Sequence, residues 1–203
     1  MSDQPSSRVA GPDDIAVVSR TVALAFFDDP VWGPAMGGAG TTLEQKEGLW
    51  RIFIAGAVRY PWSRIVNGGA AVSVWFPPDS SELDDDQEVE LQIALTGLLG
   101  PVGAAEFAEL AGRFEANHKH DVPHAYLSLL ATHPDHRGRG IGQRLLADDL
   151  ARFDAEGLAA YLESTNPGND HRSERLGFRR VGGFQAILDD APVSTMWRPA
   201  GGS

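Results

Sequence analysis

Two arginines and three glycines within six residues form the part of the sequence with the clearest chemistry. They follow an apolar stretch, Ala125–Thr132, and precede apolar residues at helical spacing, from Ile141 to Phe153. The first N–H groups of a helix have no partner within it, and the helix dipole makes that end partly positive. Glycines let an anion approach the backbone, and arginines add charged donors. We therefore expect a phosphate or pyrophosphate at this turn, which consists of Arg137, Gly138, Arg139, Gly140, Ile141 and Gly142.

The spacing of the glycines excludes two common phosphate loops. It is not the G-x-G-x-x-G of dinucleotide-binding proteins, and no G-K-[ST] of a P-loop is present. The turn resembles instead the [QR]-x-x-G-x-[GA] motif of the GNAT acetyltransferases, and residues 132–136, THPDH, are similar to that family's usual approach to the motif. A second similarity lies in Ser164–Phe178, where an asparagine precedes a short helix that ends in Leu-Gly-Phe.

The resemblance implies a fold and an activity. The fold would be α/β (α+β), a GNAT-like mixed central sheet with splayed strands, flanked by helices. The activity would be transfer of an acetyl group from acetyl-CoA, as co-substrate, to a primary amine that attacks the thioester directly. The strand Ala70–Phe76 and residues 161–165, YLEST, also resemble the puromycin N-acetyltransferase branch.

By the same resemblance, the coenzyme site would combine the turn with the strand before it. Backbone groups of Leu130, Ala131 and Thr132 would bond the pantetheine arm, and the turn would hold the pyrophosphate. A backbone N–H near Thr132 would stabilise the oxyanion. Asn166 stands where the family has an asparagine that contacts the coenzyme.

The residues for proton transfer are less well defined. Many family members have a tyrosine three residues ahead of the Leu-Gly-Phe as general acid, whereas this chain has Ser173. This difference leaves three alternatives open. Another group or water protonates the thiolate, the thiolate leaves without an acid, or the protein is a weak or inactive relative. Glu163, near the expected separation of two strands, is the candidate general base, and its alternative role is to cap the next helix or pair with an arginine.

An acidic, tryptophan- and proline-rich loop is the candidate acceptor site. Asp28, Asp29 and Trp32 would bind a cationic substrate, or the two aspartates simply form a turn at a helix end. Trp75 is a further candidate contact, although a core position is expected more strongly. The loop favours a closed pocket and hence a small amine of antibiotic-like or aminonucleoside type. The alternatives are acetylation of protein N-termini or lysines, and a non-catalytic protein that binds acetyl-CoA as a sensor or partner.

The elements that position these residues follow from periodicity and from turn residues. Residues 1–10 are expected to be a flexible end, and 11–200 a single domain. Two helices come first, then a hairpin around Asn67-Gly68, then helical segments through residues 79–99 and 104–114, and finally a β-α-β-α-β order with an added last strand.

Composition narrows the cellular setting and the partners. The 203 residues include no cysteine, and the net charge is −11. We expect no disulfide, no nucleic-acid partner and, since no long apolar run is evident, no membrane span. A polar start without a signal peptide favours the cytoplasm. The histidines do not suggest a metal site, so no metal is expected. The resemblance also implies a possible homodimer.

Overall fold

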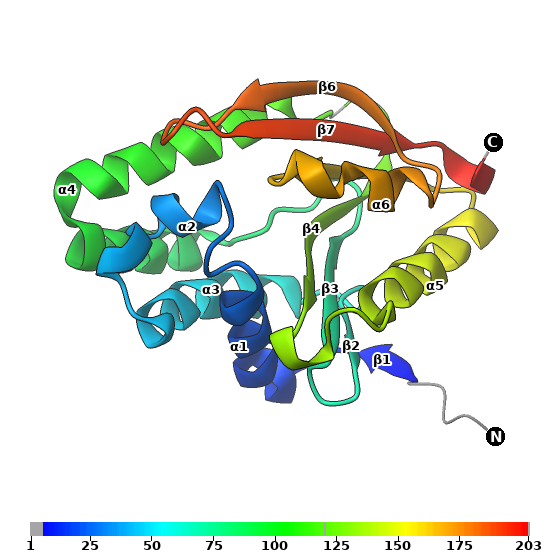
Figure 1. Ribbon diagram of the computed structural model, residues 1–203, viewed down its shortest axis with the longest axis horizontal. Helices are drawn as coiled ribbons and strands as arrows, with labels where there is room; N and C mark the ends of the chain where they lie inside the picture. The colour runs from blue at the N-terminus through cyan, green and yellow to red at the C-terminus, as the bar shows by residue number, and fades with distance from the viewer. Residues whose placement is uncertain (1–5, 120, 203) are drawn as a thin grey trace.

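The computed structural model describes residues 6–119 and 121–202, and its strands form one seven-stranded sheet in the order β1-β2-β3-β4-β5-β7-β6 (Figure 1). The strands are β1 (Ser7–Val9), β2 (Arg64–Val66), β3 (Ala71–Phe76), β4 (His124–Thr132), β5 (Ala159–Ser164), β6 (Arg179–Gln185) and β7 (Pro192–Arg198). The α-helices are α1 (Ile15–Ala25), α2 (Trp32–Ala35), α3 (Leu43–Ala57), α4 (Asp85–Asn117), α5 (Ile141–Ala155) and α6 (Asp170–Glu174).

The centre of the sheet contains a pair of strands that separate. Neighbouring strands are antiparallel except β4 and β5, which are parallel and joined through α5, as a parallel pair requires. Their pairing ends at Leu127 and Leu162. Beyond these residues β4 continues beside β3 and β5 continues beside β7. The sheet therefore opens between the carboxyl ends of its two central strands, as the expected splayed fold requires.

A bulge in β4 lies at the point of separation. Val74 pairs with Leu129 and Trp75 with Leu127, so Ser128 is the extra residue. Leu127 packs in the core beside α5, whereas Leu129 packs in the core on the other face of the sheet. One additional residue thus changes which side chains of β4 point to each face.

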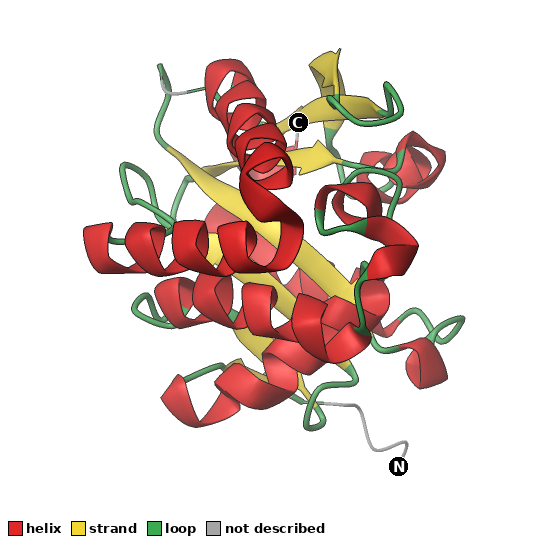
Figure 2. Ribbon diagram, turned by 90° about the vertical axis from the view of Figure 1, so that its left-hand side faces the viewer, coloured by secondary structure: helices red, strands yellow, loops and turns green. Residues whose placement is uncertain are grey.

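Helices cover both faces of the sheet (Figures 1 and 2). The larger core includes side chains of α1, α3 and α4, and a second core includes Leu146, Leu150 and Phe153 of α5. Both α3 and α4 begin with a capping box, in which Thr42 bonds with Gln45 and Asp84 with Gln87. These caps explain where the two helices start.

The two helical segments expected at residues 79–99 and 104–114 are present as the two parts of α4, which meet at a kink, and the first of them begins at Asp85. Gly100, with a φ of 72°, breaks the helical geometry directly before Pro101. By length and composition α4 would qualify as a membrane span, with a mean hydropathy of 1.3. Because its Leu95, Phe107 and Leu110 pack into the core, we treat α4 as part of the domain.

The N-terminal end differs from the expectation. A flexible end is expected over residues 1–10, yet Ser7–Val9 form β1 and pair with Arg64–Val66, while residues 1–5 lie outside the described part of the chain. Asp14 receives two hydrogen bonds from Arg8, both of 2.6 Å, which anchor this edge strand to the first helical turn. A three-residue strand carries too little pattern to be recognised in the sequence.

Candidate functional site

A cleft of about 1350 Å³ lies where β4 and β5 separate, and its lining residues come from many elements between Leu24 and Arg175. Pairing between the strands ends at Leu127 and Leu162, so the next residues, Ser128 and Glu163, face the opening. The glycine-rich turn lines this cleft, and so do His118, Lys119 and Val122–His124, which flank the connection between α4 and β4. The cleft therefore joins a candidate anion site to the point of strand separation.

The backbone of β4 presents polar groups to this opening. His133 donates its N–H to the carbonyl of Ala70, so residues 129, 131 and 133 are the ones whose backbone groups point toward β3. By alternation, the N–H and C=O groups of Leu130 and Thr132 point toward the separated side. An extended ligand can pair there as an added strand would. The backbone of Ala131, 1% exposed, faces β3 instead.

The turn before α5 has the local geometry of an anion site. Gly138 and Gly140 have φ values of 77° and 68°, a region that favours glycine, and Gly140 is the N-cap of α5. A Cβ on Gly142 would lie 2.5 Å from the Thr132 hydroxyl oxygen, so only glycine allows the helix to start this close to β4. The first-turn N–H groups of α5 thus open onto the cleft beside the end of β4.

The predicted coenzyme residues occupy this end, with differences in detail. All six turn residues except Arg139 line the cleft, and Arg139 is exposed outside it. Asn166 and Ser173 lie on the opposite side, after β5 and in α6. Arg172 and Arg175 also line the cleft and were missed, because nothing in the sequence shows that α6 faces the turn. Together with Arg137 they give the cleft three arginines, in a protein whose net charge is −11. The donors and the space suit a pyrophosphate.

Glu163 is buried at the point of strand separation, deeper in the cleft. Its side chain is 2% exposed, and among the described residues neither carboxylate oxygen has a hydrogen bond of regular geometry. Burial raises the pKa of this carboxyl from 4.5 to about 8. The hydroxyls of Tyr161 and Tyr126 oppose the rise in pKa, whereas the negative charge of Glu82 adds to it. A carboxylate in this environment is a base poised near neutral pH.

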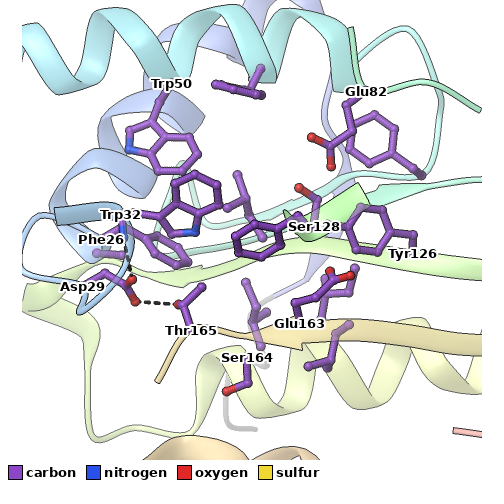
Figure 3. A pocket seen from close by; sticks show the side chains of 18 of the residues that line it. Phe26, Asp29, Trp32, Trp50, Glu82, Tyr126, Ser128, Glu163, Ser164 and Thr165 are labelled. Atoms are coloured by element: carbon purple, nitrogen blue, oxygen red, sulfur yellow. Dashed lines mark hydrogen bonds between the residues drawn. The ribbon is translucent and has the colours of Figure 1, made fainter. Parts of the chain in front are cut away.

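Aromatic side chains form the wall facing Glu163 (Figure 3). Trp32 is at its centre, with its ring 5.2 Å from that of Phe114 in a stacked arrangement and 5.6 Å from that of Trp50. The remaining aromatic lining residues are Phe26, Phe53, Phe76, Phe107 and Tyr126. Glu82 and Ser128 are close to Tyr126 on the same side of the chamber (Figure 3). The chamber is therefore apolar and aromatic, with a few acidic groups.

The two aspartates of the acceptor loop line the cleft in different ways. Asp29 accepts hydrogen bonds from the N–H groups of Val31 and Trp32, and from the hydroxyl of Thr165 at 2.7 Å. It therefore ties the loop to the end of β5 (Figure 3). Asp28 also lines the cleft. The sequence could not distinguish these positions, because Thr165 lies 136 residues away.

Trp75 lies in the core, which the sequence favours for it, and its alternative role as an acceptor contact is wrong: the residue is fully buried beside α5. Its indole N–H donates to Asp149 at 2.9 Å, and its ring packs edge-on against Phe153. Phe76, the next residue of β3, points to the opposite face and lines the cleft instead. The period of two along a strand explains the difference.

The chain is similar in sequence and in fold to known acetyltransferases. The model of the acetyltransferase (GNAT) family matches residues 70–178, which include β3 to α6. A solved structure from Corynebacterium glutamicum, described as histone acetyltransferase HPA2 and related acetyltransferase, is 24% identical, with a TM-score of 0.67 and coverage of 97% of this chain and 96% of that one.

Two insect enzymes share the fold at lower identity. Arylalkylamine N-acetyltransferase 2 from Aedes aegypti is 12% identical, with a TM-score of 0.65 and coverage of 98% of this chain and 100% of that one. Polyamine N-acetyltransferase from Drosophila melanogaster is 17% identical, with a TM-score of 0.61 and coverage of 97% and 100%. These matches extend the similarity over nearly the whole chain.

Proposed function

The chain belongs to the acetyltransferase (GNAT) family and is an acyltransferase, and from that premise we propose that it acetylates a small primary amine with an aromatic or other apolar body. The observation that carries this proposal is Glu163. Its buried carboxyl lacks regular hydrogen bonds and lies where the two central strands separate, opposite a wall of aromatic rings. A base among apolar walls suits an amine that enters as an ammonium ion and leaves as a neutral amide.

Different residues along the cleft bind different parts of the coenzyme in this proposal. Acetyl-CoA, when bound, supplies an activated acetyl thioester. The Arg137–Gly142 turn and the arginines of α6 hold its phosphates, and the backbone of Leu130 and Thr132 pairs with its extended arm. A backbone N–H of this separated strand is available to the thioester oxygen. Asn166 and Ser173 close the opposite side.

Glu163 accepts a proton from the ammonium group of the acceptor. Its pKa of about 8 makes the carboxylate a stronger base than an exposed glutamate while a useful fraction remains ionised near neutral pH. The aromatic wall excludes water and binds the body of the acceptor. Burial raises the pKa of Glu82, and in its ionised form this residue adds negative charge that favours a cation in the chamber.

Ser173 does not have to replace the tyrosine that many family members have. The side-chain thiol of cysteine has a pKa of about 8.5, so a thiolate is a tolerable leaving group near neutral pH. Departure without a strong acid is therefore consistent with a serine at this position. The proton for the thiol then comes from water or from the second proton that the amine loses.

Two measurements test the proposed function. Acetyl-CoA at about 100 times its dissociation constant should stabilise the protein by about 2.7 kcal/mol, which raises Tm by roughly 2–4 °C per kcal/mol. Thiol release is then measured with phenylethylamine, putrescine and a lysine peptide. We expect the arylalkylamine to have the highest kcat/KM. Preference for the peptide, or no thiol release with any amine, would overturn the acceptor assignment.

A pair of tryptophans tests the aromatic wall. Trp32→Ala should raise KM for the arylalkylamine about tenfold or more, because it removes the central ring of the chamber. The thermal shift with acetyl-CoA should persist in this variant. Trp62→Ala is the matched control, since Trp62 stacks on Phe153 on the other face of the sheet. An equal rise in KM for both variants would contradict an acceptor site at Trp32.

A further inference from the structure

A second carboxyl group without a full set of partners lines the cleft. Glu82, two residues before the N-cap of α4, is half-buried as a whole residue, yet its Oε1 is out of contact with solvent. Among the described residues this oxygen has no hydrogen-bond partner. No cation of residues 6–119 and 121–202 is among the groups that shift the pKa of Glu82. The carboxyl is therefore available to a ligand, as that of Glu163 is.

Contacts with α3 fix the backbone around Glu82. Gly56 of α3 lies so close to the carbonyl oxygen of Glu82 that a Cβ at this position would overlap it. Arg59 donates to the carbonyl oxygens of Ser81 and Glu82, both at 3.3 Å, and it pairs with the carboxylate of Asp84 at 3.0 Å. These contacts hold the segment before α4, so the fold itself directs the side chain of Glu82 inward.

The bulge in β4 adds a hydroxyl group at the same point. Ser128 is the extra residue of the bulge, and its side chain lies beside the carboxyl of Glu82 (Figure 3). Its hydroxyl opposes the rise in the pKa of Glu82 that burial causes. A hydroxyl that donates to a carboxylate can still accept a hydrogen bond. Glu82 and Ser128 together form a polar site, here named the distal site, in a chamber with aromatic walls.

The charges around the distal site favour a cation over a neutral hydrogen-bond donor. Burial raises the pKa of Glu82, and the negative charge of Glu115 raises it further. Glu82 in turn raises the pKa of Glu163. Carboxyl groups that disfavour one another's ionised form are stabilised by a nearby cation. An ammonium group at the distal site would favour the ionised form of Glu82, whereas a hydroxyl would leave the repulsion in place.

We propose that the distal site binds a second cationic group of the acceptor, so that the preferred substrate is a diamine whose two ammonium groups are joined by an aromatic body. The inference rests on the proposed function, because it takes the ammonium at Glu163 as the one that is acetylated. The other ammonium stays charged and lies between Glu82 and Ser128. The aromatic wall around Trp32 binds the body that joins the two ends. Glu82 is then a specificity-determining residue, which contacts the acceptor but takes no part in the transfer.

Three benzylamines that differ only at the far end of the ring test the distal site. The compound para-xylylenediamine carries a second ammonium, para-(hydroxymethyl)benzylamine a neutral donor, and para-ethylbenzylamine neither. We expect kcat/KM for the diamine to exceed that for the ethyl compound by about tenfold or more, the size of a hydrogen bond to a charged group. The two equivalent amines of the diamine account for only about twofold of this excess. An excess below about fivefold, or a hydroxymethyl compound that equals the diamine, would overturn the proposal.

The variant Glu82→Gln separates the charge of this side chain from its shape. The amide can still accept a hydrogen bond from Ser128, and loss of an unpaired buried charge should leave the fold intact. The excess of the diamine over the ethyl compound should fall to about twofold. This ratio cancels any change in the pKa of Glu163, which acts on both acceptors. Glu88→Gln is the matched control, because Glu88 also lines the cleft but is exposed. An unchanged ratio in Glu82→Gln, or an equal loss in Glu88→Gln, would contradict the distal site.

Calorimetry with coenzyme A in place of acetyl-CoA separates this inference from the proposed function, because it measures binding without transfer. We expect the Kd of para-xylylenediamine to rise about tenfold in Glu82→Gln, while that of para-ethylbenzylamine changes by less than about twofold. If no amine is acetylated but this difference is found, the distal site stands and the assigned reaction fails. If amines are acetylated and the Kd of the diamine does not respond to Glu82→Gln, the reaction stands and the distal site is wrong.

Discussion

Two carboxylates are buried on opposite faces of the same sheet, and their surroundings differ. Asp149 of α5 is fully buried and accepts hydrogen bonds from Ser73 at 2.6 Å and from the indole of Trp75 at 2.9 Å. Arg152 and Arg64 lie 3.3 and 3.6 Å from its other oxygen. Glu163 is buried almost as completely but has no regular hydrogen bond among the described residues.

Burial raises the pKa of both groups, so the pKa direction alone does not distinguish them. The two carboxylates differ in the hydrogen-bond donors that reach them. The donors around Asp149 hold α5 against β3, so the role of Asp149 is structural. Glu163 keeps its acceptors available inside a cleft, at a cost in stability that a purely structural group would not justify. An unsatisfied buried carboxylate in a cleft is therefore the stronger indicator of function.

The largest expected effect is on catalysis at Glu163. Glu163→Gln should lower kcat/KM by about 10²–10⁴-fold, the range that general-base catalysis contributes, because the amide cannot accept the ammonium proton. The thermal shift with acetyl-CoA should be retained. Glu156→Gln is the control at an exposed position, and activity in Glu163→Gln within about threefold of wild type would remove Glu163 from the reaction.

The second expected effect is a pH-dependent difference in stability. The folded pKa of Glu163 is about 8 against 4.5 for the ordinary carboxyl, so the native state binds more protons than the unfolded state between these values. The free energy of unfolding of the wild type should therefore fall as pH rises through this window. Glu163→Gln lacks this loss and should become relatively more stable, by on the order of 2–4 kcal/mol at about pH 8.5 compared with about pH 5.

Urea unfolding of wild type and Glu163→Gln at the two pH values measures that difference. Asp149 also has a raised pKa, but it is present in both proteins and cancels in the comparison. A stability difference that does not change with pH would mean that Glu163 is not protonated in the folded protein near neutral pH.

The third effect should appear in stability but not in activity. Asp149→Asn should destabilise the protein by about 1–3 kcal/mol, because its NH₂ group must face either the donors of Ser73 and Trp75 or the guanidinium groups of Arg64 and Arg152 in place of a carboxylate oxygen. We expect kcat to stay close to wild type at a temperature where the variant is folded. Asp148→Asn, at the exposed neighbouring position, is the matched control. A large loss of kcat in folded Asp149→Asn would end the distinction between the two faces.

The smallest effect is expected within the cleft itself. Ser173→Ala should change kcat by less than about threefold, because a serine hydroxyl is too weak an acid to drive departure of a thiolate. Measurement of thiol release at saturating acceptor checks this. A drop of tenfold or more would assign the serine a part in proton delivery and would weaken the contrast with Glu163.

Local sequence patterns predicted most of the elements correctly. The glycine spacing, the helix after it and the order of strands in residues 125–198 depend on contacts between near neighbours in the chain, which the sequence displays directly. The family resemblance and the splayed sheet were confirmed, and Glu163 was singled out from its place at the end of a strand. The strand β1 was missed because its three residues carry too little pattern, whereas the break between the two helical parts of α4 was predicted correctly.

Only the tertiary structure decided which of these residues share a chamber. The sequence could not separate Trp75 from Phe76 as a cleft residue, nor show that His118 and Glu82 face Glu163. A one-residue bulge at Ser128 sets the phase of β4, and the ends of α4 and α6 approach the cleft from distant parts of the chain. The periodicity of the sequence determines which face of a helix or strand is apolar. Which element packs against that face depends on contacts between residues far apart in the chain.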